Sequence, residues 1–362
     1  MEHYKIGLVP GPVKVPENIR RAWYTDYGSS DLEPEIFTLY RNNQLLTQKL
    51  LHTHNDIVIT SGEAMSILWA ALKCTLKPGE KLLAISSGLF GEGFADMARS
   101  FGVNAEVCAF PYDDVPDPNR VLEHAKAFRP SVITAVHCET PSGTLTPCLA
   151  ELGKIAHEVG ALFIVDFVSS AGGAELDVDA CGIDIGLLGS QKVLSLTSSL
   201  SISSISPRAW EVIESVNYSG YEAYSGWRNV PETRCMPYSH DWHAMKALNI
   251  SLNAIMSEGV SEVLARHEKA AKLCRDLGRN AGLQLFPKRE EICSPTVTAF
   301  YVPDGMTWPE LDAALREHGL VVGGNYGSLA GKVFRIGHMG SQADCELVEQ
   351  GMNIIAQVIT NS

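Results

Sequence analysis

Short apolar runs alternate with amphipathic stretches through the first half of the chain. Strands are predicted at the six runs 57–60, 82–85, 132–136, 162–165, 185–188 and 202–205. Nearly every position in these runs is apolar, which is the pattern of strands buried on both faces of a parallel sheet. Helical patterns separate them, for example at 64–73 and at 149–159. The alternation predicts an α/β, doubly wound domain with a mostly parallel sheet.

The second half of the chain has a different pattern. It predicts, in order, one long helix over 245–279, a strand at 296–302, a helix at 308–318, a strand around Phe334 and a last helix over 343–359. Helices and strands grouped in this way predict a smaller α+β domain. We therefore expect an N-terminal arm over 1–20, a large domain over 21–245 and a small C-terminal domain over 246–362.

Composition and charge restrict the classes of partner. The chain has 362 residues, of which 45% are hydrophobic, and a net charge of −13. That charge argues against a nucleic-acid backbone or an anionic membrane as the main partner. The sequence has no apolar run near the roughly 20 residues that span a bilayer. The first residues also lack the apolar region of a signal peptide. We expect a cytoplasmic protein with no nucleic-acid or membrane partner.

The cysteines and histidines do not predict a metal centre. Nine cysteines, an odd number, are scattered without a Cys-x-x-Cys pair. We expect most of them to be reduced and packed as small apolar residues. His52-Thr53-His54 and His137-Cys138 carry possible ligands, but no second pair stands at ligand spacing. No metal site is expected.

A glycine turn follows the first predicted strand and enters a predicted helix. Its residues are Ser61-Gly62-Glu63-Ala64-Met65. The free N–H groups and the dipole at the start of a helix favour an anion. Taken alone, the turn fits a simple helix cap as well as it fits an anion site.

Two ionisable groups follow two later predicted strands. Asp166 ends the run 162–165, and Lys192 comes shortly after the run 185–188. A buried carboxylate is costly unless it is paired or used, so Asp166 alone fits a structural ion pair as well as a functional group. Lys192 alone fits a surface lysine, or an amine whose pKa is lowered by burial.

The combination favours a specific chemistry. Ligands of open α/β sheets bind beyond the carboxyl ends of the strands, where the turn, Asp166 and Lys192 are all predicted to lie. Enzymes that use pyridoxal 5′-phosphate need a lysine that bonds the cofactor and an acid that holds the proton on its ring nitrogen. The helix start at Glu63 to Met65 would hold the phosphate. The sequence therefore predicts a pyridoxal phosphate site.

Ordered sequence blocks carry a family resemblance over nearly the whole chain. They are Leu8-Val9-Pro10-Gly11-Pro12-Val13, Thr60-Ser61-Gly62-Glu63-Ala64, Ser87-Gly88-Leu89-Phe90-Gly91, His137-Cys138-Glu139-Thr140-Pro141-Ser142-Gly143-Thr144, Val165-Asp166-Phe167-Val168-Ser169-Ser170, Gly189-Ser190-Gln191-Lys192 and Phe334-Arg335-Ile336-Gly337-His338-Met339-Gly340. In these blocks the chain resembles the class V, fold-type I aminotransferases, specifically the alanine–glyoxylate and serine–pyruvate group.

The resemblance implies roles around the cofactor ring. Lys192 would form the Schiff base and move the proton of the substrate, and Asp166 would pair with the pyridine nitrogen. Phe90 would stack on one face of the ring, and Val168 would pack on the other. Thr140 would bond near the phenolic oxygen.

The resemblance also implies phosphate and substrate contacts. The turn from Glu63, through the N–H groups of Ala64 and Met65, would hold the phosphate together with Gln191. Arg335 would clamp the substrate carboxylate, because its planar fork matches two oxygens at once.

A homodimer with shared sites follows from the resemblance as well. In the family, a Tyr-Thr pair from the other subunit completes the phosphate site. Here Tyr238 and Ser239 stand at that point. The serine keeps the hydroxyl group that the family's threonine supplies.

Two departures from the family bear on the substrate. The loop after the lysine, 193–199, lacks the Pro-Pro-Gly stretch of the family. Glu63 stands where some members have serine, and a carboxylate beside a phosphate is unfavourable. Pyridoxamine–pyruvate aminotransferases share that glutamate.

The expected activity is transfer of an amino group from alanine or serine to glyoxylate or pyruvate. The alternatives are a pyridoxamine–pyruvate or ureidoglycine–glyoxylate aminotransferase, a desulfurase, and a non-catalytic scaffold. A desulfurase needs a cysteine on a mobile loop, which we do not recognise here. A scaffold has no use for both Lys192 and Asp166.

Overall fold

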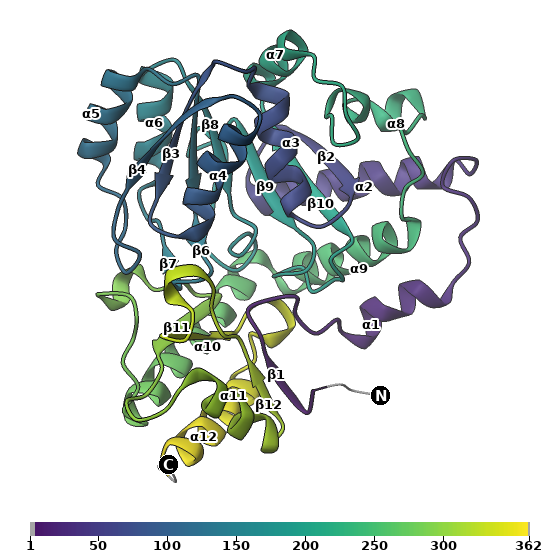
Figure 1. Ribbon diagram of the computed structural model, residues 1–362. Helices are drawn as coiled ribbons and strands as arrows, with labels where there is room; N and C mark the ends of the chain where they lie inside the picture. Colours follow the sequence, from purple (N-terminus) through teal and green to yellow (C-terminus); the bar gives the residue numbers. More distant parts are fainter. Residues whose placement is uncertain (1–3, 361–362) are drawn as a thin grey trace.

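The computed structural model describes residues 4–360 and contains a large α/β body with a smaller C-terminal body beside it (Figure 1). The large body is built on a seven-stranded sheet with the order β2-β10-β9-β8-β5-β3-β4. Its strands are β2 (Asp56–Ser61), β3 (Lys81–Ser86), β4 (Asn104–Ala109), β5 (Val132–Val136), β8 (Leu162–Asp166), β9 (Ile185–Gly189) and β10 (Leu200–Ile205). Only β10 runs antiparallel to its neighbours. The predicted mostly parallel sheet is confirmed.

All six strands predicted in the first half belong to this sheet, and the seventh, β4, was not predicted. Strand β4 lies at the edge of the sheet, and its exposed and buried positions are mixed. The six predicted strands are buried along most of their length, so their apolar runs are nearly continuous. Strand β4 has exposed residues at Asn104, Glu106 and Ala109, so its sequence lacks that continuity.

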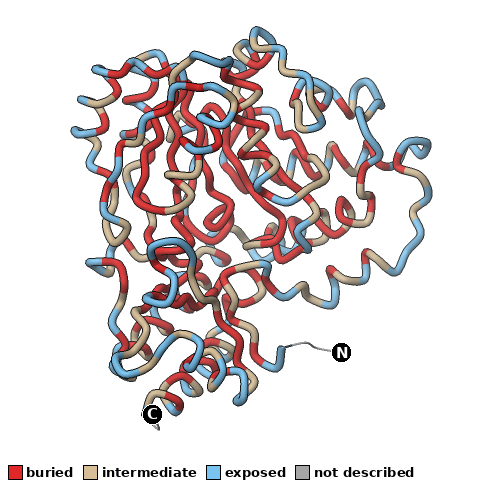
Figure 2. Tube along the Cα trace, in the orientation of Figure 1, coloured by how far each residue is buried: buried red, intermediate tan, exposed pale blue. Residues whose placement is uncertain are grey.

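Helices cover both faces of the sheet (Figure 1). The principal ones are α2 (Glu35–Leu51), α3 (Met65–Thr75), α4 (Leu89–Ser100), α5 (Pro118–Phe128), α6 (Leu149–Glu158) and α7 (Pro207–Val216). The buried residues concentrate along the strands and on the inner sides of these helices (Figure 2). Between residues 4 and 360, no helix has both the length and the apolar character needed to cross a membrane.

The long helix predicted over 245–279 is wrong in one respect, because the structure has two helices there. They are α9 (Trp242–Glu258) and α10 (Val260–Asn280), and Gly259 separates them with a φ of +96°. That angle lies outside the helical region, and glycine adopts it readily because it has no Cβ. Helix α9 packs against α2 of the large body, whereas α10 packs against α12 (Cys345–Thr360) of the small body.

The small body combines short sheets with two further helices. Strands β11 (Val297–Tyr301) and β13 (Val333–Gly337) pair antiparallel, and α11 (Trp308–Glu317) lies between them in sequence. From the N-terminal arm, β1 (Ile6–Leu8) pairs parallel with β12 (Leu320–Val322). The predicted boundary at 245/246 falls inside α9, and the division into arm, large and small domains stays a prediction.

Candidate active site

Asp166 and Lys192 follow two strands that lie side by side. Strands β8 and β9 are parallel neighbours, so Asp166 at the end of β8 and Lys192 shortly after β9 belong to the same edge of the sheet. The Nζ of Lys192 donates a hydrogen bond of 2.5 Å to the carbonyl oxygen of Pro10. A Cβ on Gly11 would lie 2.4 Å from Cδ of Lys192. The N-terminal arm therefore closes directly on this lysine.

The surroundings of Lys192 favour its neutral amine. Burial lowers the pKa of Lys192 to about 8, and the positive charge of Arg335 acts in the same direction. The carboxylate of Asp166 acts against this shift and is the weaker influence. An amine that loses its proton near neutral pH is a nucleophile and a proton acceptor.

We expect Lys192 in the cofactor-free protein to react with pyridoxal with a midpoint near pH 8. Its lowered pKa means that the neutral, reactive fraction grows as the pH rises and levels off above that midpoint. At pH 7, about a tenth of such amines are neutral, compared with about one in 3,000 for an ordinary lysine. The rate of pyridoxal binding, followed by absorbance between pH 6 and 10, measures this. A midpoint above pH 10 would contradict it.

Asp166 is buried, and one of its two oxygens is free. Its Oδ1 accepts a hydrogen bond of 2.8 Å from the N–H of Val168. Its Oδ2 has no donor within residues 4–360. Burial raises the pKa of Asp166 to about 6, and the Val168 N–H opposes that shift. Asp166 also forms no ion pair in the described part of the chain, so Oδ2 is available to a cationic donor such as a protonated ring nitrogen.

Residues predicted to flank the cofactor ring lie in or near the same edge. Val168, two residues after Asp166, is buried. Thr140 is buried, and its hydroxyl group lies 2.5 Å from that of Ser169. Phe90, the second residue of α4, is partly buried. Ser169 lies in one of the sequence blocks that carry the family resemblance, but the sequence predicted no role for it.

Glu139 is a buried carboxylate to which sequence reasoning gave no role. It accepts hydrogen bonds from the N–H groups of Phe90 and Gly91, at 3.3 and 2.7 Å, at the start of α4. A Cβ on Gly88 would lie 2.4 Å from Cδ of Glu139, so only glycine leaves room for it. Burial raises the pKa of Glu139 to about 8. The signal available in sequence was its place beside Thr140.

The predicted phosphate turn holds a carboxylate of the chain itself. Oε2 of Glu63 accepts a hydrogen bond of 2.9 Å from the N–H of Met65, and Oε1 accepts one of 2.9 Å from the side-chain amide of Gln191. These are two of the donors predicted for phosphate. Glu63 thus does not point away from the turn, and its carboxylate stands where the phosphate was predicted.

Arg335 lies on β13 and reaches the site from the small body. It is 4% exposed, and its Nε and Nη2 donate to the carbonyl oxygen of Gly324 at 2.8 and 2.5 Å. Its guanidinium lies 5.0 Å from the ring centre of Tyr326. A Cβ on Gly323 would lie 3.5 Å from Nη2 of Arg335 and 2.6 Å from Cδ of Pro10, the residue that accepts the hydrogen bond of Lys192, so the two cations lie near each other. Sequence reasoning missed Tyr326, although the run 323–327 is marked by three glycines.

Tyr238 and Ser239 are engaged away from the lysine. The ring of Tyr238 lies 4.5 Å from that of Tyr221, and the hydroxyl group of Ser239 donates to Asp31 at 2.6 Å. Tyr238 is 41% exposed. Both residues are therefore on the outer surface of the protomer, next to the segment that leads into α9.

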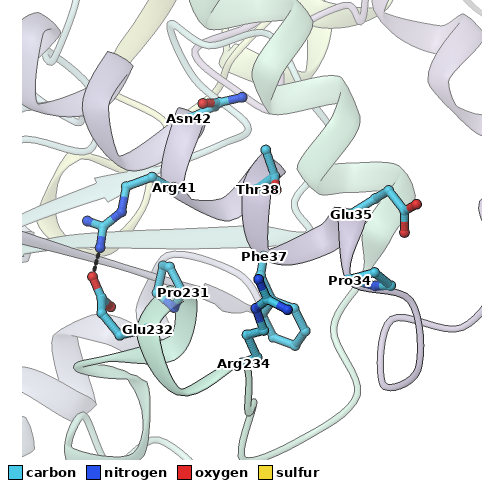
Figure 3. Close-up of a pocket in the computed structure, with 9 residues that line it drawn as sticks. All are labelled: Pro34, Glu35, Phe37, Thr38, Arg41, Asn42, Pro231, Glu232 and Arg234. Atoms are coloured by element: carbon cyan, nitrogen blue, oxygen red, sulfur yellow. Dashed lines mark ion pairs between the residues drawn. The ribbon is translucent and has the colours of Figure 1, made fainter.

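A separate surface pocket of about 510 Å³ lies between α2 and α8 (Val230–Thr233) (Figure 3). An ion pair between Arg41 and Glu232 crosses it, and Arg234 lies at its side. Its lining residues are Pro34, Glu35, Phe37, Thr38, Arg41, Asn42, Pro231, Glu232 and Arg234. None of the predicted site residues is among them, so the candidate site remains at the strand ends.

The residues at the strand ends fit the ring of pyridoxal phosphate more closely than they fit its phosphate group. Around the ring, a buried lysine, a carboxylate with a free oxygen and an apolar wall are all in place. At the phosphate end, Glu63 occupies the N–H of Met65 and the amide of Gln191. A phosphate fits there only after the Glu63 side chain has turned away, whereas an unphosphorylated ring needs no such change.

Comparisons with known proteins identify the family of this chain. The family profile of class V aminotransferases matches residues 19–335. The chain is 32% identical over 345 residues to the pyridoxamine–pyruvate transaminase of Mesorhizobium japonicum, covering 93% of this chain and 87% of the relative.

Solved structures of such enzymes superpose closely. The pyridoxamine–pyruvate aminotransferase of Mesorhizobium loti has a TM-score of 0.95 at 28% identity, covering 99% of this chain and 93% of the other. The alanine–glyoxylate aminotransferase of Nostoc has a TM-score of 0.94 at 27% identity, covering 99% and 96%. The family profile, which spans most of the chain, and the lysine and aspartate at adjoining strand ends lead to one assignment: this protein belongs to the class V aminotransferases, which are pyridoxal phosphate-dependent enzymes of fold type I.

Proposed function

We propose that the protein transfers an amino group from a small amino acid, alanine or serine, to glyoxylate or pyruvate, with pyridoxal phosphate as the coenzyme. The observation that carries this proposal is that Lys192 and Asp166 follow adjoining strands and that Arg335, from the small body, lies near Pro10, to which Lys192 donates. This arrangement supplies an amine, an acid and a carboxylate-binding cation around one space. The Nostoc relative, named for alanine and glyoxylate, supports the substrate class.

Lys192 and Asp166 carry the chemistry in this proposal. When bound, pyridoxal phosphate withdraws electrons from the substrate α-carbon and so makes its proton removable. The amine of Lys192 would bond the coenzyme covalently and afterwards take and return that proton. Asp166 would hold a proton on the ring nitrogen through its free Oδ2. The lowered pKa of Lys192, about 8, matches the task of a base at neutral pH.

Arg335 would orient both substrates by their carboxylate. Because Nε and one N–H of Nη2 are taken by Gly324, the Nη1 side of the fork remains for a bound carboxylate. The carbonyl group of Gly324 fixes the guanidinium in one plane. Orientation of this kind presents the substrate α-carbon to Lys192 and lowers the entropy cost of reaction.

The assembly in this proposal is a homodimer with shared sites. Tyr238 and Ser239 are on the surface of one protomer and point to partners other than its own Lys192. Tyr221, whose ring lies beside that of Tyr238, is also exposed, which supports an interface there. We keep the cytoplasm as the proposed location, which the nine free thiols support.

The test is an absorbance spectrum of the purified protein, followed by titration with single donors. A band from the bond between Lys192 and the coenzyme should disappear on addition of alanine or serine and return with glyoxylate or pyruvate. A band that persists after addition of either amino acid would contradict the proposal. (S)-Ureidoglycine and pyridoxamine are titrated in parallel, and a response to only one of them identifies a different donor.

Glu63 favours a second candidate function, the transfer of the amino group of free pyridoxamine to pyruvate. The Glu63 carboxylate bonds the two donors that would otherwise hold a phosphate, so the turn is already satisfied and negatively charged. Like charges in one small site repel strongly. The relatives from Mesorhizobium, named for pyridoxamine and pyruvate, support this candidate.

We expect Glu63→Ser to tighten pyridoxal phosphate binding by about 10-fold or more, because it removes a charge and frees two donors. The affinity for unphosphorylated pyridoxal should change far less. Titration of the cofactor-free protein with each compound, followed by absorbance, measures both dissociation constants. The control is Glu158→Ser on the surface of α6, which removes the same negative charge away from the site. Wild-type protein that already binds the phosphorylated form much more tightly would contradict the second candidate.

A further inference from the structure

A loop of the small body lies on the rim of the candidate site. It runs over 323–329, between β12 and β13. The side-chain amide of Asn325 donates a hydrogen bond of 2.7 Å to the carbonyl oxygen of Pro141, the residue after Thr140. Gly327 sits against Leu89, the residue before Phe90, so closely that a Cβ would lie 2.9 Å from Leu89 Cδ2. The loop is thus tied to the large body beside two predicted cofactor residues.

Tyr326 is the large side chain of this loop, and it lies on Arg335. The ring centre is 5.0 Å from the guanidinium carbon, within the range of a cation–π contact. Arg335 is 4% exposed, whereas Tyr326 is 62% exposed. The tyrosine therefore forms the outer layer over the buried cation. With the carbonyl group of Gly324 on one edge and the Tyr326 ring on one face, the plane of the guanidinium is fixed from two directions.

The carboxylate site depends on this one cation. Seven segments lie at or beside the strand ends described above, at 9–13, 60–66, 88–91, 138–144, 166–170, 189–199 and 323–329. Apart from Lys192, these segments contain no lysine or arginine. Besides Lys192, these segments thus supply no cation of their own, so a substrate carboxylate held there depends on the orientation of Arg335.

We propose that Tyr326 is a specificity-determining residue that fixes the guanidinium of Arg335 and shields the bound monocarboxylate from water. This inference rests on the proposed function, because it takes Arg335 as the carboxylate clamp. A charge-assisted hydrogen bond strengthens when water is excluded from it, because the local dielectric constant falls. The exposed ring supplies that cover without adding a second charge, which suits a short acid with one carboxylate.

The experiment measures binding of propionate, a short and unreactive monocarboxylate, to the purified holoenzyme by calorimetry. Tyr326→Ala should weaken propionate binding by about 5-fold, the loss of a partly shielded cation–π contact. Tyr326→Phe keeps the ring but removes the hydroxyl group that also acts on Arg335, so its affinity should lie between those of the wild type and Tyr326→Ala. The KM for pyruvate should rise by the same factor as the dissociation constant, with kcat little changed, because the contact acts on binding in general. Tyr24→Ala, which removes another exposed tyrosine, is the matched control.

Arg335→Ala distinguishes a failure of the carboxylate clamp from a failure of the role of Tyr326. If propionate binds Arg335→Ala as tightly as the wild type, the carboxylate clamp itself is wrong, and with it the proposed function. If Arg335→Ala loses binding while Tyr326→Ala binds like the wild type, only the role of Tyr326 is overturned. Equal weakening in Tyr326→Ala and Tyr24→Ala would also overturn it, since the effect would then not depend on Arg335. Because Tyr326 is largely exposed, thermal unfolding should be nearly unchanged in its variants.

Discussion

Replacing Lys192 with alanine should reduce amino transfer by about 10³-fold or more, because the group that moves the substrate proton is lost. Alanine offers neither an amine that bonds the coenzyme nor a base near the substrate. The visible band of the bonded coenzyme should also be absent. Steady-state rates with alanine and glyoxylate, together with the absorbance spectrum of the variant, measure both effects.

The control for this variant is Lys81→Ala. Lys81 begins β3 and so lies at the opposite edge of the sheet from the carboxyl ends, where its Nζ donates to the carbonyl oxygen of Phe128. This control removes the same side chain and should keep the band and most of the rate. Added methylamine should restore part of the rate of Lys192→Ala, since a free amine can replace the missing base. Retention of more than a tenth of the wild-type rate in Lys192→Ala would contradict the assignment of Lys192.

Replacing Asp166 with asparagine should lower the rate by about 10²-fold to 10³-fold with little loss of fold. Asparagine can still accept the Val168 N–H, so the local backbone is preserved. It carries no charge, so it does not stabilise a protonated ring nitrogen. The defect should appear in kcat as well as in kcat/KM, because the lost interaction strengthens in the transition state. Single-turnover kinetics with alanine measure it.

The pH profile shows whether the defect of Asp166→Asn comes from the lost charge or from a change in the fold. Burial raises the pKa of Asp166 to about 6 in the cofactor-free protein, so the binding of pyridoxal to that protein should weaken further as the pH drops through that value. The charged form is the form that pairs with the ring nitrogen, and acid removes it. In Asp166→Asn this acid limb of the binding profile should disappear. Asp179→Asn, which removes a carboxylate paired with His54 away from the site, should keep the acid limb. An unchanged acid limb in Asp166→Asn would assign it to another group.

Much of the fold was predictable from sequence because the central strands of the sheet are buried on both faces. Central strands such as β5 and β8 are buried at every position, so their residues are apolar without interruption. The parallel direction of these strands places their carboxyl ends at one edge. For that reason the positions of Asp166 and Lys192 after two strands were sufficient to predict that they lie together.

Other features were not predictable because they depend on contacts between distant segments. The break at Gly259 is one glycine in an otherwise helical pattern, and its φ of +96° arises where the chain passes from the large to the small body. The role of Glu139 depends on Phe90 and Gly91 in the first turn of α4, which lie 49 and 48 positions earlier in the chain. Nothing in the local sequence of either segment indicates such partners.

The sequence by itself determined the sheet, the edge at which the ligand site lies, and the identity of the lysine, aspartate and arginine assigned to it. The sheet, the lysine and the aspartate follow from local periodicity and from the position of charged residues after buried strands, whereas the arginine follows from the family resemblance. Only the tertiary structure decided what each charge faces. It placed the Glu63 carboxylate on Met65 and Gln191, the arm's Pro10 on Lys192, and Tyr326 over Arg335. Hydrogen bonds and ring contacts act over a few ångströms, so they are fixed by the packing of distant segments and not by their order in the chain.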